Sequence, residues 1–347
     1  MHKTISIDDA LKMDDPLYID MRSPSEFHTG HVYGAINIPL FEDDERAEVG
    51  TIYKNIGVEE AKIRGLAIAS SKLPQIINQI CQISKNKNTV IIYCWRGGMR
   101  SRSVVTILEL LGSSVYQLVG GYKAYRRHVL DSLQSFSLKP KIVVLCGSTG
   151  VGKTTLLKLL DEKDIPVIDL EKLANHRGSA FGQVGLGQPE TAQNFDANIL
   201  QELERHNNKP YIVVECESKR VGNVYLPEVL YNAMQKGIKI LVHASVETRI
   251  NRLIEEYTDL YDSNRDAIIA SLRVLSKRLG VNKTEYLVDA FSNGRISEVV
   301  HVLLVDYYDP LYGYEKSDPS AYDFIVDAEN LEQASCLITS YLKKLGR

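Results

Sequence analysis

The sequence Ile142-Val-Val-Leu-Cys146 runs directly into Gly147-Ser-Thr-Gly150-Val-Gly152-Lys153-Thr154-Thr155, which is followed by an apolar run, Leu156 to Leu160. The first segment is typical of a buried parallel strand and the last of a helix, so the glycine-rich segment between them matches the P-loop pattern in its proper context. Backbone N–H groups of such a loop surround a phosphate, while a lysine adds charge and a threonine hydroxyl can hold a metal ion. The expected phosphate-binding residues are Gly147, Gly150, Val151, Gly152, Lys153, Thr154 and Thr155.

The pattern around this loop predicts an α/β fold. Further strands are expected at 166–169, 211–215, 238–243 and 324–327, with helical stretches between them. Strands that alternate with helices predict a parallel sheet covered on both faces. Residues 246–306 are expected to form a mostly helical appendage. A polar hinge around Pro140 separates this half from the rest, so we predict domains at 1–137 and 138–347.

Two more positions are candidates for the same site. Glu215 ends an apolar strand, where P-loop proteins place the acid that orders a metal ion or water, and Glu217 could share this role. The alternative is a pair of surface glutamates. Arg177 belongs to the polar, glycine-rich segment 169–182, which follows the second strand of this half on the rim where α/β sheets bind ligands.

Two other features leave alternatives open. Arg249 and Arg252 lie three residues apart in a predicted helix, where they could close over phosphates or pair with Glu255 and Glu256. The segment 305–312 contains three tyrosines and two carboxylates. Such a cluster can stack on a base or an apolar ligand tail, or it can simply pin a turn.

The first half contains a second candidate site, which is built around a thiol. Strands are expected at 17–20 and 89–93, and Cys94 follows the second of them. The loop after Cys94 contains Arg96 and Arg100 beside two glycines, and an apolar helical run follows. A strand, a tight loop and a helix N-terminus together make an anion site, in which a thiolate and the two arginines can act. The alternative is a cysteine buried in the core, which the glycines and arginines disfavour.

This half resembles the rhodanese-type sulfurtransferase family. The resemblance rests on Asp20-Met-Arg22-Ser-Pro24-Ser-Glu26-Phe27, Gly30-His31, Gly34-Ala-Ile-Asn-Ile-Pro39 and Gly120-Gly121-Tyr122, with Cys94 at the persulfide-forming position. One feature departs from that family, because five residues rather than four separate Cys94 from Arg100. The longer loop is otherwise seen in rhodanese-fold phosphatases of the cell-cycle type. It implies a larger donor, such as a phosphorus-bearing chalcogen compound.

The two halves together resemble the bacterial tRNA 2-selenouridine synthase family over residues 4–340. The motifs that carry this resemblance are Cys94–Ser101, Asn175–Ser179 and Tyr307–Tyr312. It implies an enzyme that attaches a geranyl group from geranyl diphosphate to the 2-thiouridine at the wobble position of tRNA. The enzyme then replaces the S-geranyl group with selenium from selenophosphate.

The same resemblance implies roles for the candidate residues. The P-loop would grip the diphosphate, with Mg²⁺ as an optional companion and no tightly bound cofactor or protein metal centre. Cys94 would either carry selenium as a selenyl-sulfide or guide selenophosphate onto C2 of the base. Arg96 and Arg100 would bind the phosphate of that donor.

Charge and composition give little support to a nucleic-acid binder. The chain has 41 Lys and Arg residues against 44 Asp and Glu residues. RNA contacts would need a local patch, and a solvated helix face is the alternative for the one candidate. That patch is Lys123, Arg126, Arg127 and His128 beside Tyr122 and Tyr125. Five scattered cysteines without a CxxC pair disfavour disulfides and a zinc site. With no apolar run of ~20 residues, we expect a cytoplasmic protein without a membrane span.

Two rival interpretations remain at this stage. The first is a rhodanese-fold phosphatase or sulfurtransferase fused to a small-molecule P-loop kinase, which would hydrolyse ATP without RNA. The second is a redox- or nucleotide-sensing module whose thiol loop only binds anions.

Overall fold

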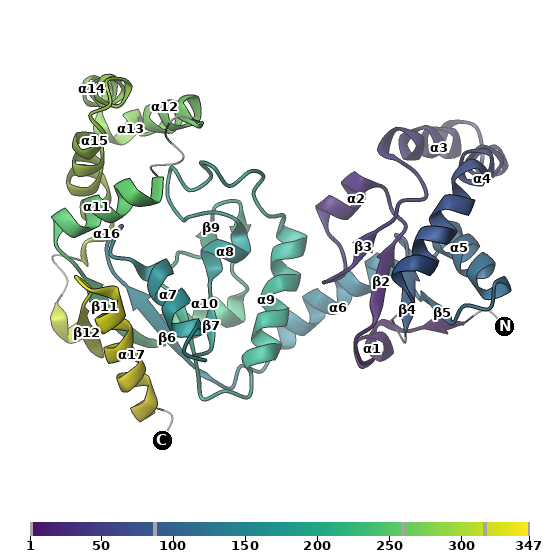
Figure 1. Ribbon diagram of the computed structural model, residues 1–347, viewed down its shortest axis with the longest axis horizontal. Helices are drawn as coiled ribbons and strands as arrows, with labels where there is room; N and C mark the ends of the chain where they lie inside the picture. The colour runs from purple at the N-terminus through teal and green to yellow at the C-terminus, as the bar shows by residue number, and fades with distance from the viewer. Residues whose placement is uncertain (1–2, 86–88, 258–260, 262, 315–317, 346–347) are drawn as a thin grey trace. The chain divides into compact units, whose positions relative to one another are not determined.

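The structure is a computed structural model, and it describes residues 3–85, 89–257, 261, 263–314 and 318–345 (Figure 1). It divides into two compact units, residues 1–135 with 191–200 and residues 136–190 with 201–347. The expected division at 137/138 assigned residues 191–200, which include the start of helix α9 (Ala192–His206), to the second half. The structure groups them with the first unit.

Unit 1 is built on a five-stranded sheet in which all neighbouring strands are parallel. The strand order is β1 (Thr4–Ile5), β5 (Val115–Leu118), β4 (Val90–Tyr93), β2 (Leu17–Asp20) and β3 (Ile36–Asn37). The two strands expected from the sequence, β2 and β4, pair with each other in this sheet. The helices are α1 (Ile7–Ala10), α2 (Pro24–Thr29), α3 (Asp43–Asn55), α4 (Val58–Ile83), α5 (Met99–Leu110) and α6 (Gly121–Ser135).

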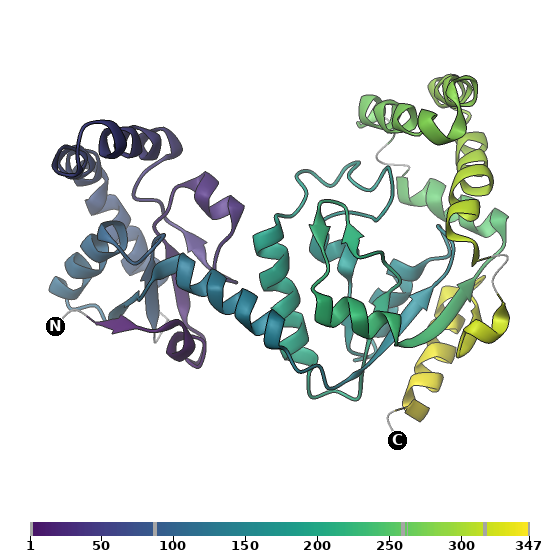
Figure 2. The same cartoon turned by 180° about the vertical axis from the view of Figure 1, so that it is seen from behind.

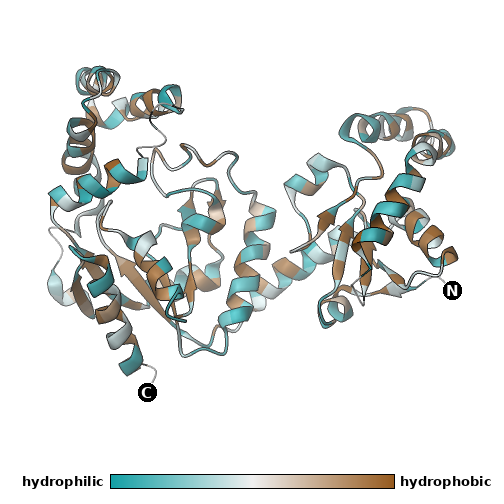
Figure 3. Cartoon of the chain, in the orientation of Figure 1, coloured by the Kyte–Doolittle hydropathy of each residue, from teal (hydrophilic) through white to brown (hydrophobic). Residues whose placement is uncertain are grey.

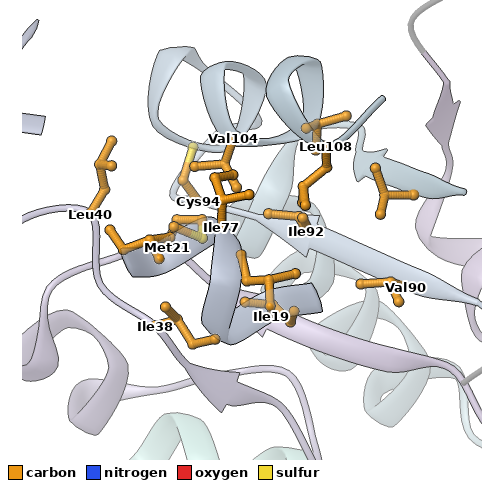
Figure 4. Packing of buried hydrophobic residues seen from close by; sticks show 14 of the residues in the cluster. Ile19, Met21, Ile38, Leu40, Ile77, Val90, Ile92, Cys94, Val104 and Leu108 are labelled. Atoms are coloured by element: carbon orange, nitrogen blue, oxygen red, sulfur yellow. The ribbon is translucent and has the colours of Figure 1, made fainter. Parts of the chain in front are cut away.

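The core of unit 1 surrounds these two strands. Every residue of β2 and of β4 is buried, as expected for parallel strands that are covered on both faces. Side chains from α4 and α5 complete the cluster, among them Ile77 and Leu108. Figure 4 shows Cys94 in this cluster beside Val104 of α5. The thiol therefore lies where the core meets the start of α5.

Unit 2 contains a second all-parallel sheet, which confirms the predicted α/β class. Its order is β12 (Phe324–Asp327), β11 (Ile238–His243), β6 (Lys141–Cys146), β8 (Tyr211–Glu215) and β7 (Val167–Ile168). Helices α7 (Lys153–Asp161) and α17 (Leu331–Leu345) pack together on one face (Figure 1), and α10 (Glu228–Gln235) comes to the front when the unit is seen from behind (Figure 2). The P-loop follows the central strand β6. It therefore opens at the carboxyl edge of the sheet, where α/β proteins bind ligands.

The remaining elements of unit 2 lie beside this sheet. They are α8 (Leu170–Ala174), the hairpin β9 (Arg220–Val221) and β10 (Val224–Tyr225), α11 (Val246–Tyr257), α12 (Arg265–Val274), α13 (Ser276–Leu279), α14 (Val281–Ser292) and α15 (Ile296–Leu303), then the π-helical turn Leu304–Tyr308, α16 (Asp309–Tyr312) and the 3₁₀ turn Pro319–Ala321. Helices α12, α14 and α15 form a hydrophobic cluster of their own, and α15 is largely brown in Figure 3. In the part of the chain that the structure describes, no helix is long and apolar enough to cross a membrane.

Candidate active site

The thiol loop of unit 1 directs two hydrogen-bond donors at the sulfur of Cys94. The backbone N–H of Gly98 lies 3.2 Å from Sγ, and the hydroxyl of Ser101 lies 3.3 Å from it. The Gln117 side-chain amide donates to the Ser101 oxygen (2.9 Å) and to the Gly97 carbonyl (2.8 Å). Because an amide NH₂ only donates, the Ser101 oxygen accepts there, and its one hydrogen has two acceptors at 3.3 Å, the sulfur and the Gly98 carbonyl. The loop therefore presents partial positive charge to Sγ.

The shape of this loop depends on glycine. Gly97 has φ +66°, and a side chain there would lie 2.7 Å from the carbonyl oxygen of Leu118. Gly121 has φ +56°, and a side chain there would lie 2.2 Å from the Cys94 carbonyl oxygen. Glycine alone adopts such φ values freely and allows such close approach. Cys94 itself is 3% exposed and belongs to the hydrophobic cluster of unit 1, as the alternative of a buried core cysteine expected, while its sulfur accepts hydrogen bonds from the loop.

The two arginines that we expected at the anion are placed differently from each other. Arg100 donates to both carboxylate oxygens of Glu26, at 2.6 and 3.3 Å. Burial opposes ionisation of Glu26, but the hydrogen bonds and charge of Arg100 lower its pKa below the ordinary value. Arg96 lies on the exposed side of the loop. Arg100 thus anchors α2 to α5, and Arg96 is the arginine open to an incoming anion.

A buried arginine beneath the loop escaped the sequence analysis. Arg22 is 1% exposed and binds Asp20 through Nε and Nη2. Its guanidinium lies 4.0 Å from the ring centroid of Tyr122 and 5.9 Å from that of Trp95. Burial opposes its charge, yet the hydrogen bonds and charge of Asp20 raise the pKa of Arg22. The spacing of Asp20 and Arg22 was the sequence signal for this ion pair. Arg22 supports the thiol loop through its contact with Trp95.

The proposed RNA patch on α6 is only partly exposed. Tyr122 and Tyr125 are buried, so their rings cannot stack on a base there. Arg126 forms an ion pair with Asp196. Lys123 and Arg127 remain exposed, as expected for a solvated helix face. The aromatic part of that interpretation is therefore wrong.

The P-loop of unit 2 has the geometry that its sequence predicts. Lys153 begins α7, and its Nζ donates to the carbonyls of Gly147 (2.7 Å) and Ser148 (3.4 Å). Gly150 and Gly152 have φ values of +82° and +92°. Among the other predicted residues, Val151 is buried and Thr155 is exposed. Lys153 thus bridges the loop at the position where a phosphate would bind.

Arg249 and Arg252 of α11 donate hydrogen bonds to backbone carbonyls of the P-loop. Arg249 donates from Nε to the Thr149 carbonyl (2.8 Å), and Arg252 donates from Nη1 to the Val151 carbonyl (2.9 Å). Arg249 is 2% exposed and also forms an ion pair with Asp309 through its two terminal nitrogens, Nη1 and Nη2. Both arginines therefore fix the backbone of the loop, a role that neither of the expected alternatives described.

The side chain of Arg177 contacts residues outside the P-loop. It donates to the Val184 carbonyl (2.8 Å) and pairs with Glu256 of α11 (3.1 Å). Its guanidinium lies 5.2 Å from the ring centroid of Tyr257. It fastens the 169–182 segment to α11.

Glu215 is a buried acid at the end of β8. It is 2% exposed, which makes the surface-glutamate alternative wrong. One carboxylate oxygen accepts from the backbone N–H of Glu171 (2.8 Å), and the other has no partner among the described residues. Burial above all, and then the charge of Asp169, raises the pKa of Glu215 well above its ordinary value. Through this hydrogen bond Glu215 positions the backbone of Glu171.

Glu171 and Glu217 form an acidic pair beside the P-loop. Thr154 donates its hydroxyl to Glu171 (3.3 Å). A side chain at Gly178 would lie 2.7 Å from a carboxylate oxygen of Glu171 and 2.8 Å from one of Glu217, so both carboxylates face this glycine. Burial is the main cause that raises the pKa of each to about 7. The polar segment 169–182 was the sequence signal for a site at this position. Its contact with Glu217 depends on the fold and could not be read from the sequence.

This acidic pair predicts an unusual pH dependence of stability. Glu217 ionises near pH 4.5 when unfolded and near pH 7 when folded, so the unfolding free energy should fall as pH rises through this window. We expect Glu217→Gln to be more stable than the native chain at pH 8, on the order of 1 kcal/mol, and equally stable near pH 4.5. Urea titrations at both pH values measure this. Glu162→Gln, at an exposed glutamate, is the control, and an equal effect of both substitutions would contradict the prediction.

Comparisons with known proteins match both halves of the chain. The family described as "tRNA 2-selenouridine synthase AAA domain" matches residues 140–342, and the rhodanese-like domain family matches residues 6–128. A tRNA 2-selenouridine synthase of Nitrosomonas europaea is 32% identical over 89% of this chain and 91% of its own length. Those of Shewanella denitrificans and Pseudomonas syringae are 34% and 33% identical, over 86% and 90% of this chain and 88% and 92% of their own.

Proposed function

The chain belongs to the tRNA 2-selenouridine synthase family, and from this premise we propose that it replaces sulfur with selenium on a tRNA uridine in two steps. The observation that carries the proposal is the presence of two anion-binding loops in one chain. Each connects a parallel strand to a helix, one around Cys94 and the other at Gly147–Gly152. Two loops match two successive substrates that each contain phosphate.

In the first step, the P-loop binds the diphosphate of geranyl diphosphate. The sulfur of 2-thiouridine attacks C1 of the geranyl chain, the C–O bond breaks, and diphosphate leaves while the base loses its N3 proton. Lys153 and the loop N–H groups stabilise the charge that develops on the leaving diphosphate. Diphosphate release is thus the step that this loop accelerates.

Magnesium suits this first site, because Mg²⁺ needs only one or two protein oxygens besides phosphate oxygens and water. Thr154 and Glu171, which lie within hydrogen-bond distance of each other, would hold it. The described residues contain no group of three or more His, Cys, Asp or Glu side chains that could hold a metal ion without a ligand. The ion would neutralise charge on the leaving diphosphate.

In the second step, selenium from selenophosphate replaces the S-geranyl group at C2. Selenium attacks C2, geranyl thiol leaves, and water then cleaves the selenium–phosphorus bond to give phosphate. Selenium in selenophosphate is already fully reduced, so this exchange needs no oxidant. A selenyl-sulfide on Cys94 would need a two-electron oxidant, and electron balance therefore favours a guiding role for Cys94. Arg96, at the open side of the loop, would pair with the phosphate.

The base would stack on Trp95 during this step. Trp95 follows Cys94 directly, is 40% exposed, and its ring centroid lies 5.9 Å from that of Tyr122. Because Trp95 is the one tryptophan of the sequence, we expect thiolated tRNA to quench the intrinsic fluorescence. Trp95→Ala should raise the KM for tRNA roughly tenfold, in line with the loss of one stacked base. Tyr33→Ala, at another exposed aromatic residue of unit 1, is the control; an equal loss in both variants would argue against stacking.

The test of the whole proposal is reconstitution. Purified protein is incubated with thiolated tRNA, geranyl diphosphate and selenophosphate, and the digested nucleosides are identified by mass spectrometry. We expect S-geranyl-2-thiouridine first and 2-selenouridine second. Absence of both would refute the proposal. ATP hydrolysis that saturates, depends on Lys153 and needs no RNA would instead favour a rhodanese-fold enzyme fused to a small-molecule kinase.

A further inference from the structure

An apolar cavity in unit 2 opens beside the P-loop. Its wall includes Thr149 of the P-loop itself and Leu253 of α11. A side chain at Gly150 would lie 3.2 Å from Leu253, so the loop backbone and the cavity wall are in contact. An occupant of the cavity would therefore adjoin a phosphate held in the P-loop.

The cavity wall is almost entirely hydrocarbon and aromatic. Helix α12 contributes Leu272 to this wall, and helix α14 contributes Phe291. Helix α15 contributes Ile296 and Val300, which are only half-buried although most of their neighbours belong to the hydrophobic cluster. The polar groups of the wall are all hydroxyls, those of Thr149, Ser179, Tyr257, Tyr261 and Tyr308, and the remaining lining is aliphatic or aromatic. Such a mainly apolar wall can bury an alkyl chain.

The wall also contains an irregular backbone segment. Tyr308 lines the cavity and is the last residue of the π-helical turn Leu304–Tyr308. The next residue, Asp309, is the ion-pair partner of Arg249, which holds the Thr149 carbonyl. Single π-helical turns occur frequently at functional sites. The segment 305–312 thus joins the cavity wall to the P-loop.

We infer that this cavity binds the isoprenoid chain of the diphosphate ester whose diphosphate lies in the P-loop. The inference rests on the proposed function, to which it adds the residues that select the chain. Helices α11, α12, α14 and α15 would shield the chain from water and leave C1 at the P-loop. Affinity should then rise with chain length, because each further buried methylene adds a favourable hydrophobic contribution.

The experiment compares inorganic pyrophosphate, dimethylallyl diphosphate and geranyl diphosphate by calorimetry on the whole chain in Mg²⁺-containing buffer. We expect the Kd of geranyl diphosphate to be at least about tenfold lower than that of pyrophosphate. Val300→Phe, which places a ring in the cavity, should remove this advantage and leave pyrophosphate binding unchanged. Val274→Phe, the same exchange at an exposed position of α12, should bind all three ligands as the native chain does.

The outcomes separate the inference from the proposed function. If pyrophosphate binds to the native chain but chain length adds nothing, or if Val300→Phe leaves the affinity for geranyl diphosphate unchanged, the chain does not occupy this cavity. If neither ligand binds to the native chain, the P-loop assignment fails and the inference fails with it. If Val300→Phe loses pyrophosphate binding through misfolding, Ile296→Phe is a second variant that fills the same cavity.

Discussion

Replacing Lys153 with alanine is expected to abolish S-geranyl-2-thiouridine and, with it, 2-selenouridine. The Lys153 ammonium bridges the carbonyls of Gly147 and Ser148, and under the proposed function it stabilises the charge that develops on the leaving diphosphate. Loss of one such preorganised group typically lowers kcat by about 10²- to 10³-fold. Mass spectrometry of nucleosides from thiolated tRNA incubated with geranyl diphosphate alone measures the first step directly.

The matched control is Lys158→Ala, at an exposed lysine on the same helix α7. It removes the same charge from the domain but not from the loop, so S-geranyl-2-thiouridine should form at the native rate. If the Lys153 variant geranylates tRNA normally, the P-loop does not bind the diphosphate. If both variants lose activity equally, the effect comes from net charge.

Replacing Cys94 with alanine is expected to have the opposite pattern, in which S-geranyl-2-thiouridine accumulates and 2-selenouridine is absent. The sulfur is the acceptor for both the Gly98 N–H and the Ser101 hydroxyl, so its removal leaves the loop without its central group. We expect a fall of at least about 10²-fold in the second step, comparable to the loss of one general catalytic group. The two nucleosides are quantified in the same digest.

Two further variants make this result interpretable. Cys81→Ala removes a partly buried cysteine of the same unit and should leave both nucleosides unchanged. Cys94→Ser keeps a polar group that can still accept from Gly98 and should retain part of the activity if Cys94 guides selenophosphate. A serine variant as inactive as the alanine variant would indicate a covalent role for the sulfur. Normal 2-selenouridine in Cys94→Ala would remove Cys94 from the mechanism.

The sequence predicted the strands that contain at least three consecutive apolar residues. β2, β4, β6, β8, β11 and β12 lie where expected, because such runs, rich in β-branched side chains, favour strands. β1 and β3, of two residues each, were missed, whereas β7, which is equally short, was expected within 166–169. β5 was missed although its four residues are largely buried, because Gln117 interrupts the apolar run. Gln117 also donates to Ser101. The polar side chain that contacts the thiol loop is therefore the one that made β5 hard to predict.

The two loops were predictable because each is local in sequence, whereas their supports are not. Arg249 reaches the Thr149 carbonyl across 100 residues, and Gln117 reaches the Gly97 carbonyl across 20. Arg100 was assigned to an anion because its partner Glu26 lies 74 residues away. The cavity could not be predicted, because apolar residues at helical spacing indicate a packed core equally well. Only the fold distinguishes a packed interior from one that leaves space beside a loop.

The contact between Arg249 and Asp309 has a consequence for how this sequence can diverge. The two positions are 60 residues apart, yet each neutralises the other in the interior. Exchange of one alone would strand a charge there, which typically costs about 3–5 kcal/mol, whereas a joint exchange for a well-fitting neutral pair costs far less. We therefore expect positions 249 and 309 to covary, so that related sequences either keep both Arg249 and Asp309 or replace both.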